Sequence, residues 1–204
     1  MAVVTTPDDP SASQVAELWE DLLAELAATA EQYRADGWET VELHPGDVTA
    51  LSGQYGDRVG LDVLIPDDEY RALEAWFDAG LGVDDCEVYR TAVGDVVLLL
   101  VVVRDETDRR AVLYPAFYDL DDDRARSLLE TAARSGAVRT YLRRLSGDYV
   151  ELRHDDPDLF APPPTVDRSA DADADVDPPT PDGPVDDRSA DADVDVDAPD
   201  PDDG

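Results

Sequence analysis

The amino-acid composition changes sharply at residue 161, and this change limits how much of the chain can fold. Residues 161–204 contain 15 Asp and two Arg but no Glu and no aromatic residue, and the segment 167–177 recurs at 187–197 with one substitution. Two copies without large apolar side chains cannot bury a face, and low hydrophobicity with high charge is typical of disorder. We therefore predict a flexible N-terminus at 1–10, a single domain at 11–160 and a disordered acidic tail at 161–204.

The charge of the chain predicts adaptation to a salty solvent. The formal net charge is −34, all 16 basic residues are Arg, and the chain has no Lys, no Asn and a single Ile, Ile65. A GC-rich genome alone could remove those residue types, but it would not produce 50 acidic residues. Self-repulsion destabilises compact states, and molar salt reduces it because the Debye length falls to roughly 3 Å at 1 M. We predict a halophilic protein whose acidic surface is hydrated rather than bound to a basic partner.

Three sequence features bear on cellular location. Met1–Pro10 has no basic segment followed by an apolar one, so we expect no signal peptide. The longest apolar run, Val96–Val103, is far shorter than the roughly 20 residues of a membrane-spanning helix. The single cysteine, Cys86, excludes an intramolecular disulfide. We predict a cytoplasmic protein without a membrane partner.

The spacing of apolar residues predicts an α+β fold. Helical spacing, Pro or Ser near the start and Gly near the end indicate three helices, at about 11–35 (capped by Ser11 or Ser13), 66–80 and 121–136. Extended patterns indicate strands at 38–43, 59–65, 86–92, 95–104, 111–118, 138–145 and 149–154. We predict a mostly antiparallel sheet of about six to seven strands packed with three helices. Val96–Val103 lacks polar alternation, which favours a central strand, and Pro115 favours an edge or bulge.

Basic residues gather near the end of the predicted domain. Between Arg124 and Arg153, seven Arg outnumber three acidic residues. Alternation along the last hairpin places Arg139, Tyr141 and Arg143 on one side, and we expect Arg153 to join them, with Tyr149 and Glu151. Guanidinium groups and rings suit phosphate, nucleic acid or carboxylate ligands. The alternative is that these Arg pair with acidic residues of the same chain.

The candidate partners differ in how well they fit a salty solvent. Nucleic acid is disfavoured, because high salt removes the free energy of counterion release. The partner is otherwise unknown, and a protein is one candidate. The edge near Pro115, with the aromatic run Tyr114–Tyr118, is a second surface considered for binding.

Catalytic patterns are weak. Asp62 and Glu87 on successive strands resemble the acidic pair of metal-dependent nucleases, but the companion lysine is missing. His154 with Asp155, Asp156 and Asp158 offers metal-ligand types, at the point where the domain gives way to the tail. His44-Pro-Gly-Asp47 is typical of a turn, and Cys86 has no histidine near it in sequence.

The tail offers one further metal pattern. Asp171, Asp173 and Asp175 have the spacing of a calcium loop, but the turn glycine and the closing Glu are absent.

These observations favour a non-enzymatic binding or accessory module, and we predict no cofactor and no metal. The alternative is a metal-dependent hydrolase that uses Asp62 and Glu87 or the His154 cluster. A third possibility is that the tail itself works as a polyanion that keeps the domain dispersed.

Four segments carry a family resemblance: Gly37–Thr49, Gly60–Tyr70, Val96–Arg104 and Tyr114–Tyr118. Together they resemble a family of small uncharacterised haloarchaeal proteins known as a domain of unknown function. The resemblance covers about residues 12–160 and leaves the tail outside. It implies salt adaptation, and it implies no activity and no site residues.

Overall fold

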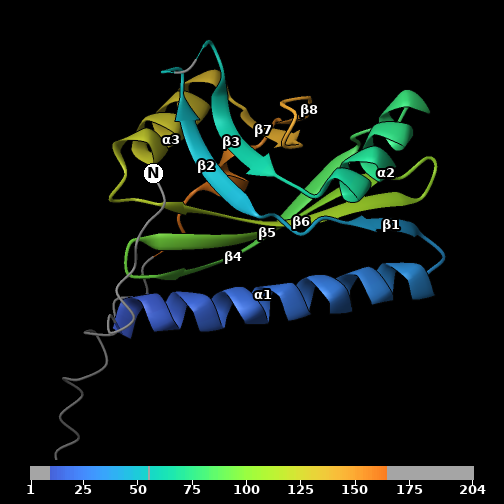
Figure 1. The fold of residues 1–204 in the computed structure, drawn as a ribbon, viewed down its shortest axis with the longest axis horizontal. Helices are drawn as coiled ribbons and strands as arrows, with labels where there is room; N and C mark the ends of the chain where they lie inside the picture. The colour runs from blue at the N-terminus through green and yellow to red at the C-terminus, as the bar shows by residue number, and fades with distance from the viewer. Residues whose placement is uncertain (1–9, 55, 165–204) are drawn as a thin grey trace, which may run out of the picture. The chain divides into compact units, whose positions relative to one another are not determined.

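The computed structural model describes residues 10–54 and 56–164, which form three α-helices and eight strands (Figure 1). Their order is α1 (Pro10–Ala35), β1 (Glu39–Glu42), β2 (Asp47–Ser52), β3 (Val59–Leu64), α2 (Asp67–Asp78), β4 (Asp85–Val93), β5 (Val96–Asp105), β6 (Arg110–Asp119), α3 (Asp123–Ser135), β7 (Val138–Arg143) and β8 (Tyr149–His154), followed by a 3-10 turn at Pro157–Phe160. The predicted α+β class is confirmed. The predicted acidic tail from residue 165 onward and the N-terminus up to residue 9 lie outside the described residues.

The strands form two mixed sheets of four strands each. Sheet A has the order β1-β6-β5-β4 and sheet B the order β2-β3-β7-β8. β1 pairs with β6 and β3 with β7 in parallel, and the other neighbours are antiparallel. The prediction of one sheet of six to seven mostly antiparallel strands is therefore inexact: there are eight strands in two sheets, although four of the six pairs are antiparallel. β2 was not predicted, and both parallel pairs join strands that are distant in sequence, as Leu61 opposite Thr140 shows.

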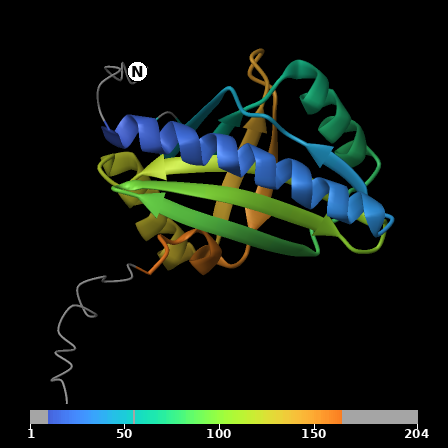
Figure 2. The ribbon, with the colours of Figure 1, turned by 90° about the horizontal axis from the view of Figure 1, so that it is seen from below.

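Sheet A is covered on both faces, and β5 runs through its middle. Leu98, Leu100 and Val102 pack against Leu22, Leu26 and Ala30 of α1. Figure 2 shows α1 lying along the strands of this sheet. The alternate β5 residues, from Val97 to Val103, face the opposite side and join a second apolar cluster. This double burial explains the unbroken apolar run and confirms the prediction of a central strand.

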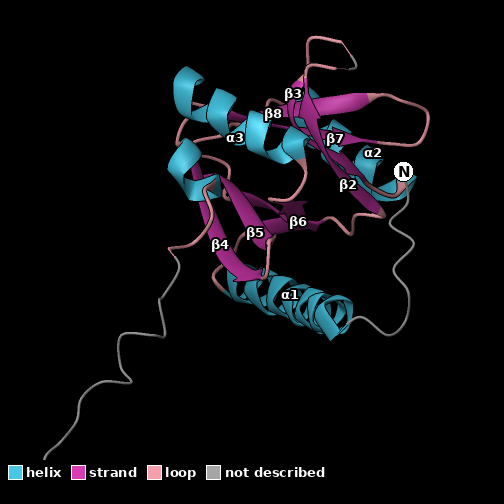
Figure 3. Ribbon diagram, turned by 90° about the vertical axis from the view of Figure 1, so that its left-hand side faces the viewer, coloured by secondary structure: helices cyan, strands magenta, loops and turns pink. Residues whose placement is uncertain are grey.

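Sheet B packs on the face of sheet A that α1 leaves open, with α2 and α3 beside it (Figure 3). The apolar cluster between the sheets includes Leu61, Val63, Leu142 and Leu152 from sheet B. The helices contribute the following buried residues: Tyr70 and Leu73 from α2, and Ala125, Leu128 and Ala132 from α3. Sheet B therefore has one face in the core and one face, called here the outer face, that points away from it.

Local signals account for the ends of the helices. α2 follows Pro66 and has three acidic residues in its first turn, where the helix dipole favours them. In α3 the Asp122 side chain accepts a hydrogen bond from the Arg124 amide, and Gly136 closes the helix with a φ of 70°. α1 begins at Pro10, ahead of Ser11 and Ser13, so the predicted serine caps are wrong.

Two further observations concern the strand edges and the lengths of the helices. Among the described residues, β1 pairs with β6 only as far as Leu113, so Pro115 lies on a stretch of β6 that has no partner strand on that side, as predicted. Within residues 10–164, none of the helices has an apolar stretch long enough to cross a membrane.

Candidate functional site

The outer face of sheet B carries the residues that the sequence singled out. Arg139 lies opposite Arg153, Tyr141 opposite Glu151, and Arg143 opposite Tyr149. Because side chains alternate along a strand, all six share one face. The parallel pairing of β3 with β7 adds Asp62 beside Tyr141. The structure thus brings Arg139, Tyr141, Arg143 and Arg153 onto one surface.

Arg143 is occupied by carboxylates of the same sheet. Its Nε donates to Oδ2 of Asp62 at 2.5 Å, and its Nη2 lies 4.0 Å from Oδ2 of Asp47. Asp62 is buried, and Nη1 of Arg58 lies 3.6 Å from its other oxygen. A buried carboxylate needs such compensation, so Arg143 and Arg58 serve chiefly to neutralise Asp62.

Arg139 and Arg153 are differently arranged. Nε of Arg139 donates to Oε1 of Glu151 at 3.0 Å, and Nε of Arg153 donates to Oδ1 of Asp155 at 2.8 Å. Within the described residues, the terminal nitrogens of these two guanidinium groups make no hydrogen bond. Each group is therefore oriented by one internal ion pair while most of its five donors remain open to solvent.

The two tyrosines of this face differ in accessibility. Tyr141 is only 3% exposed, and burial, followed by the charge of Glu151, raises its pKa. Its ring therefore offers almost no exposed surface on which a ligand could stack. Tyr149 is 45% exposed and meets Tyr141 edge to face, with ring centroids 5.5 Å apart.

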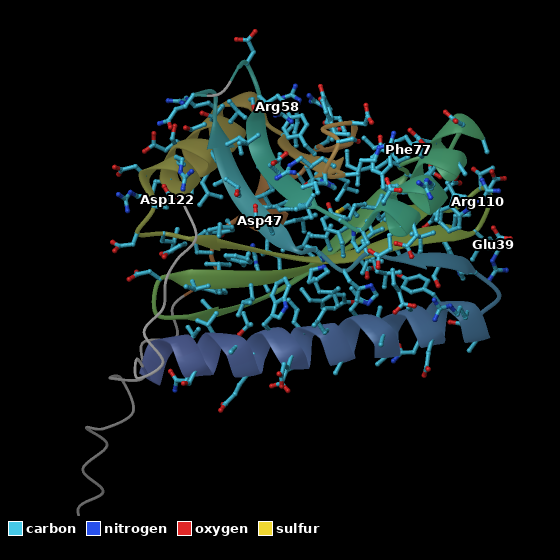
Figure 4. The ribbon with its side chains drawn as sticks, viewed as in Figure 1. Glu39, Asp47, Arg58, Phe77, Arg110 and Asp122 are labelled. Carbon is cyan, nitrogen blue, oxygen red and sulfur yellow. The ribbon has the colours of Figure 1, made fainter. Side chains whose placement is uncertain are left out.

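Arg58 lies against the two tyrosine rings of the outer face. Its guanidinium lies 5.3 Å from the Tyr141 ring centroid and 5.1 Å from that of Tyr149. Figure 4 shows Arg58 near the loop between β2 and β3, and Asp47 at the other end of β2. In the β7–β8 turn, Leu145 is 86% exposed. The sequence patterns did not single out Arg58, which lies just before the strand predicted at 59–65. They also did not single out Leu145, which lies at the end of the strand predicted at 138–145 but beyond the end of β7 at Arg143.

The acidic pair considered for catalysis is not a pair in the structure. Asp62 lies on β3 of sheet B, whereas Glu87 lies on β4 of sheet A. Oε1 of Glu87 is 3.0 Å from Nη2 of Arg104. Each carboxylate is held by arginine within its own sheet, so the two do not share a metal position.

His154 points into the core and not toward the neighbouring acids. It is 2% exposed, its Nε2 lies 3.2 Å from the Tyr114 hydroxyl and 3.3 Å from that of Thr140, and it packs on Phe160. Burial lowers its pKa to about 4, so the ring is neutral at pH 7.

The acids that follow His154 have separate partners. Asp155 pairs with Arg153, and Asp156 accepts the amide of Asp158. Among the described residues, no three His, Cys, Asp or Glu side chains are grouped closely enough to hold a metal ion. The predicted calcium-like run at Asp171–Asp175 lies outside those residues.

The remaining candidates are the single thiol and the second histidine. Burial, helped by the charges of Glu87 and Asp156, raises the pKa of Cys86 to about 12, so its thiol is protonated at neutral pH. In the turn at His44, Nδ1 lies 2.8 Å from Oε1 of Glu69, whose Oε2 accepts the His44 amide at 2.7 Å. Glu69 thereby ties the turn to α2.

Comparison with known proteins gives a family but no activity. Residues 8–162 match the model of a family of unknown function, DUF7529. No curated protein and no solved structure matches the chain.

Proposed function

The chain belongs to the DUF7529 family, and we propose that its domain is a non-enzymatic binding module that recognises a carboxylate-bearing protein partner through the outer face of sheet B. One observation carries the proposal: Arg139 and Arg153 lie opposite each other with their terminal nitrogens unoccupied within the described residues. Two guanidinium groups side by side repel each other unless anions lie between or beside them. Glu151 and Asp155 balance the two positive charges, and a partner's carboxylate would accept hydrogen bonds from the terminal N–H donors that they leave open.

The geometry of these guanidinium groups favours carboxylates. Arginine presents a planar fork of donors that matches a carboxylate through two parallel hydrogen bonds. Because Nε of each group is already held by Glu151 or Asp155, less side-chain entropy is lost when the partner binds.

Apolar side chains at the other end of the same hairpin favour a protein over a small anion. Tyr149, opposite Arg143, and Leu145, in the turn that joins β7 to β8, are both exposed. Exposed aromatic and aliphatic anchors flanked by Arg are typical of the residues that dominate binding energy in protein interfaces. Apolar contacts also persist in concentrated salt, where long-range charge attraction is screened.

The solvent in which the module works is part of the proposal. Residues 1–160 hold 35 acidic and 14 basic residues, a net charge of −21. We infer that most of these carboxylates serve hydration in a salty cytoplasm. A haloarchaeal origin, predicted from the same composition, would agree with this role of the carboxylates, and that origin stays a prediction.

The metal-dependent hydrolase is not proposed as a second function. Asp62 and Glu87 lie on different sheets, and His154 is buried beside Tyr114 and Thr140.

A labelled peptide that alternates Glu with Leu tests the proposal in molar KCl, by fluorescence anisotropy and by amide shifts in NMR spectra. We expect saturable binding with shifts in Val138–Arg143 and Tyr149–His154. The double variant Arg139→Ala/Arg153→Ala should bind at least about tenfold more weakly, because two charged hydrogen-bonding groups are lost.

Two controls make this result specific. Arg71→Ala removes an exposed arginine of α2 that pairs with Asp67, and it should leave binding unchanged. A peptide with Gln in place of Glu should bind weakly if the carboxylates matter. Equal binding of the two peptides, or shifts confined to other elements, would contradict the proposal.

A further inference from the structure

A second surface feature lies on the other side of the domain, where α1 meets sheet A. It is a cleft with a volume of about 370 Å³. Its lining comes from α1, the segment after it, the edge strand β4 and β5, namely Glu25, Thr29, Gln32, Tyr33, Asp36, Trp38, Tyr89 and Arg104. The volume is in the range of small-molecule sites, which begin at about 300 Å³.

Three of the residues that line the cleft are aromatic: Tyr33, Trp38 and Tyr89. The rings of Tyr33 and Trp38 meet edge to face with centroids 5.4 Å apart, and Tyr89 is 53% exposed. The guanidinium of Arg109 already lies 5.7 Å from the Trp38 ring centroid. This internal contact already occupies one face of the Trp38 ring, so a ligand cation can use only the remaining surface of that ring.

The ionised groups around the cleft are mostly acidic. Within the part of the chain that the structure describes, the carboxylates of Glu25 and Asp36 have no ion-pair partner. The cationic lining residue, Arg104, is paired with Asp85 and with Glu87 at 3.0 Å. The positive charge of Arg104 is therefore offset by two carboxylates. Arg109, which donates to the backbone carbonyl of Asp36, offsets part of the remaining charge, and Glu25 and Asp36 together still leave the cleft net negative.

The hydroxyl groups of Tyr89 and Tyr33 contact charged side chains near the cleft. The Tyr89 hydroxyl donates to Oε2 of Glu87 at 3.1 Å, and Nη1 of Arg104 lies 3.4 Å from the Tyr33 hydroxyl. Burial raises the pKa of Tyr89, with further contributions from Glu87, Tyr33 and Glu25. Tyr89, Tyr33 and Glu25 all line the same cleft.

We propose that this cleft binds a small organic cation of the alkylated ammonium class, held by the Tyr33, Trp38 and Tyr89 rings and by the Glu25 and Asp36 carboxylates. An alkylated ammonium group presents both positive charge and apolar surface, which matches aromatic faces combined with acids. A bare alkali ion is too small to fill the volume and gains nothing from the apolar parts of the rings. An anion would meet two uncompensated carboxylates.

The site is independent of the proposed protein-binding surface, since it involves α1 and sheet A rather than sheet B. Each proposal can therefore fail without the other.

Tetramethylammonium chloride is the probe for this cleft. It is titrated into the full chain in molar KCl at constant ionic strength, and binding is followed by saturation transfer to its methyl protons and by the shift of the Trp38 indole N–H. We expect saturable binding in spite of the excess of K⁺, because the rings favour the alkylated cation. The Tyr89→Leu variant should bind about two- to fivefold more weakly, as loss of one partly exposed cation–π contact implies.

Control variants separate the contribution of the Tyr89 ring to probe binding from general effects of substitution. Val83→Ala truncates an exposed apolar side chain that does not line the cleft and should bind the probe like the unmodified chain. Tyr89→Phe keeps the ring and should retain binding, whereas Glu25→Gln should weaken it. Because Tyr89 is exposed, its variants are expected to fold, which circular dichroism checks. A lack of saturable binding, or equal binding by Tyr89→Leu, would overturn the proposal.

Discussion

A Cβ atom placed on Gly60 would lie 2.2 Å from the carbonyl oxygen of Arg139 and 2.9 Å from its carbonyl carbon. The backbones of β3 and β7 therefore approach more closely here than any side chain at residue 60 allows. This is the parallel pair that joins the two halves of sheet B and supports Arg139 on its outer face.

Replacing Gly60 with Ala should lower the free energy of unfolding by roughly 2–4 kcal/mol, because the clash is with backbone and the strands must move apart. Denaturant unfolding in molar KCl measures the change. Gly46→Ala is the matched control, since nothing lies within 4 Å of the added carbon there. Equal free energies of unfolding for the two variants would contradict this prediction, because β3 and β7 would then accommodate the added methyl group without loss of stability.

Salt concentration should control folding. We expect native far-UV circular dichroism in molar KCl and a substantial loss of it below about 0.2 M, because repulsion among the acidic residues is then poorly screened. The same stability in both solutions would contradict the proposal that the protein is halophilic.

His154 should make the protein less stable in mild acid. Its folded-state pKa of about 4 is below the ordinary value of 6.5, so the unfolded chain binds the proton more tightly. The contribution of the neutral ring is complete above pH 6.5 and is lost as the pH falls toward 4, reaching a loss of about 2 kcal/mol at pH 5.

Unfolding free energies at pH 7 and pH 5 measure this effect. The difference between the two should shrink by that amount in a His154→Phe variant. It should persist in His44→Gln, which changes a histidine that lies outside the core. A His154→Phe variant with the full pH dependence would mean that other groups cause it.

Cys86 should react slowly with iodoacetamide in the folded protein. With its pKa raised to about 12, the thiolate fraction at pH 8 is on the order of 10³-fold below that of a free cysteine. Mass spectrometry over time gives the rate, with the chain unfolded in guanidinium as reference.

A Cys86→Ala/Val83→Cys variant provides the control, because Val83 is exposed and a thiol there should react nearly as fast as a free one. Rapid modification of Cys86 in the native chain would instead make it a candidate nucleophile.

Deleting residues 162–204 should leave the melting temperature in molar KCl almost unchanged, because a polyanionic segment has few apolar groups to bury. Differential scanning calorimetry of the two chains makes the comparison. A large decrease would mean that the segment docks on the domain, with Arg139, Arg143 and Arg153 as the expected contacts.

Local patterns in the sequence determined much of what could be predicted. The spacing of Leu22, Leu26 and Ala30 identifies the buried stripe of α1, and Gly136 marks the end of α3. The alternation at Arg139, Tyr141 and Arg143 places them on one face, because the period of a strand is set by the backbone alone.

Tertiary structure alone decided which distant elements meet. The β3–β7 pair, the separation of Asp62 from Glu87, the burial of His154 and Tyr141, and the cleft formed by Glu25, Trp38 and Tyr89 all depend on it. The entropy cost of closing a loop depends only weakly on its length. Many pairings between distant strands therefore have similar costs, and the local sequence does not distinguish among them. Which strands pair is decided by how the whole core packs, and the spacing of residues along the chain does not indicate the pairing.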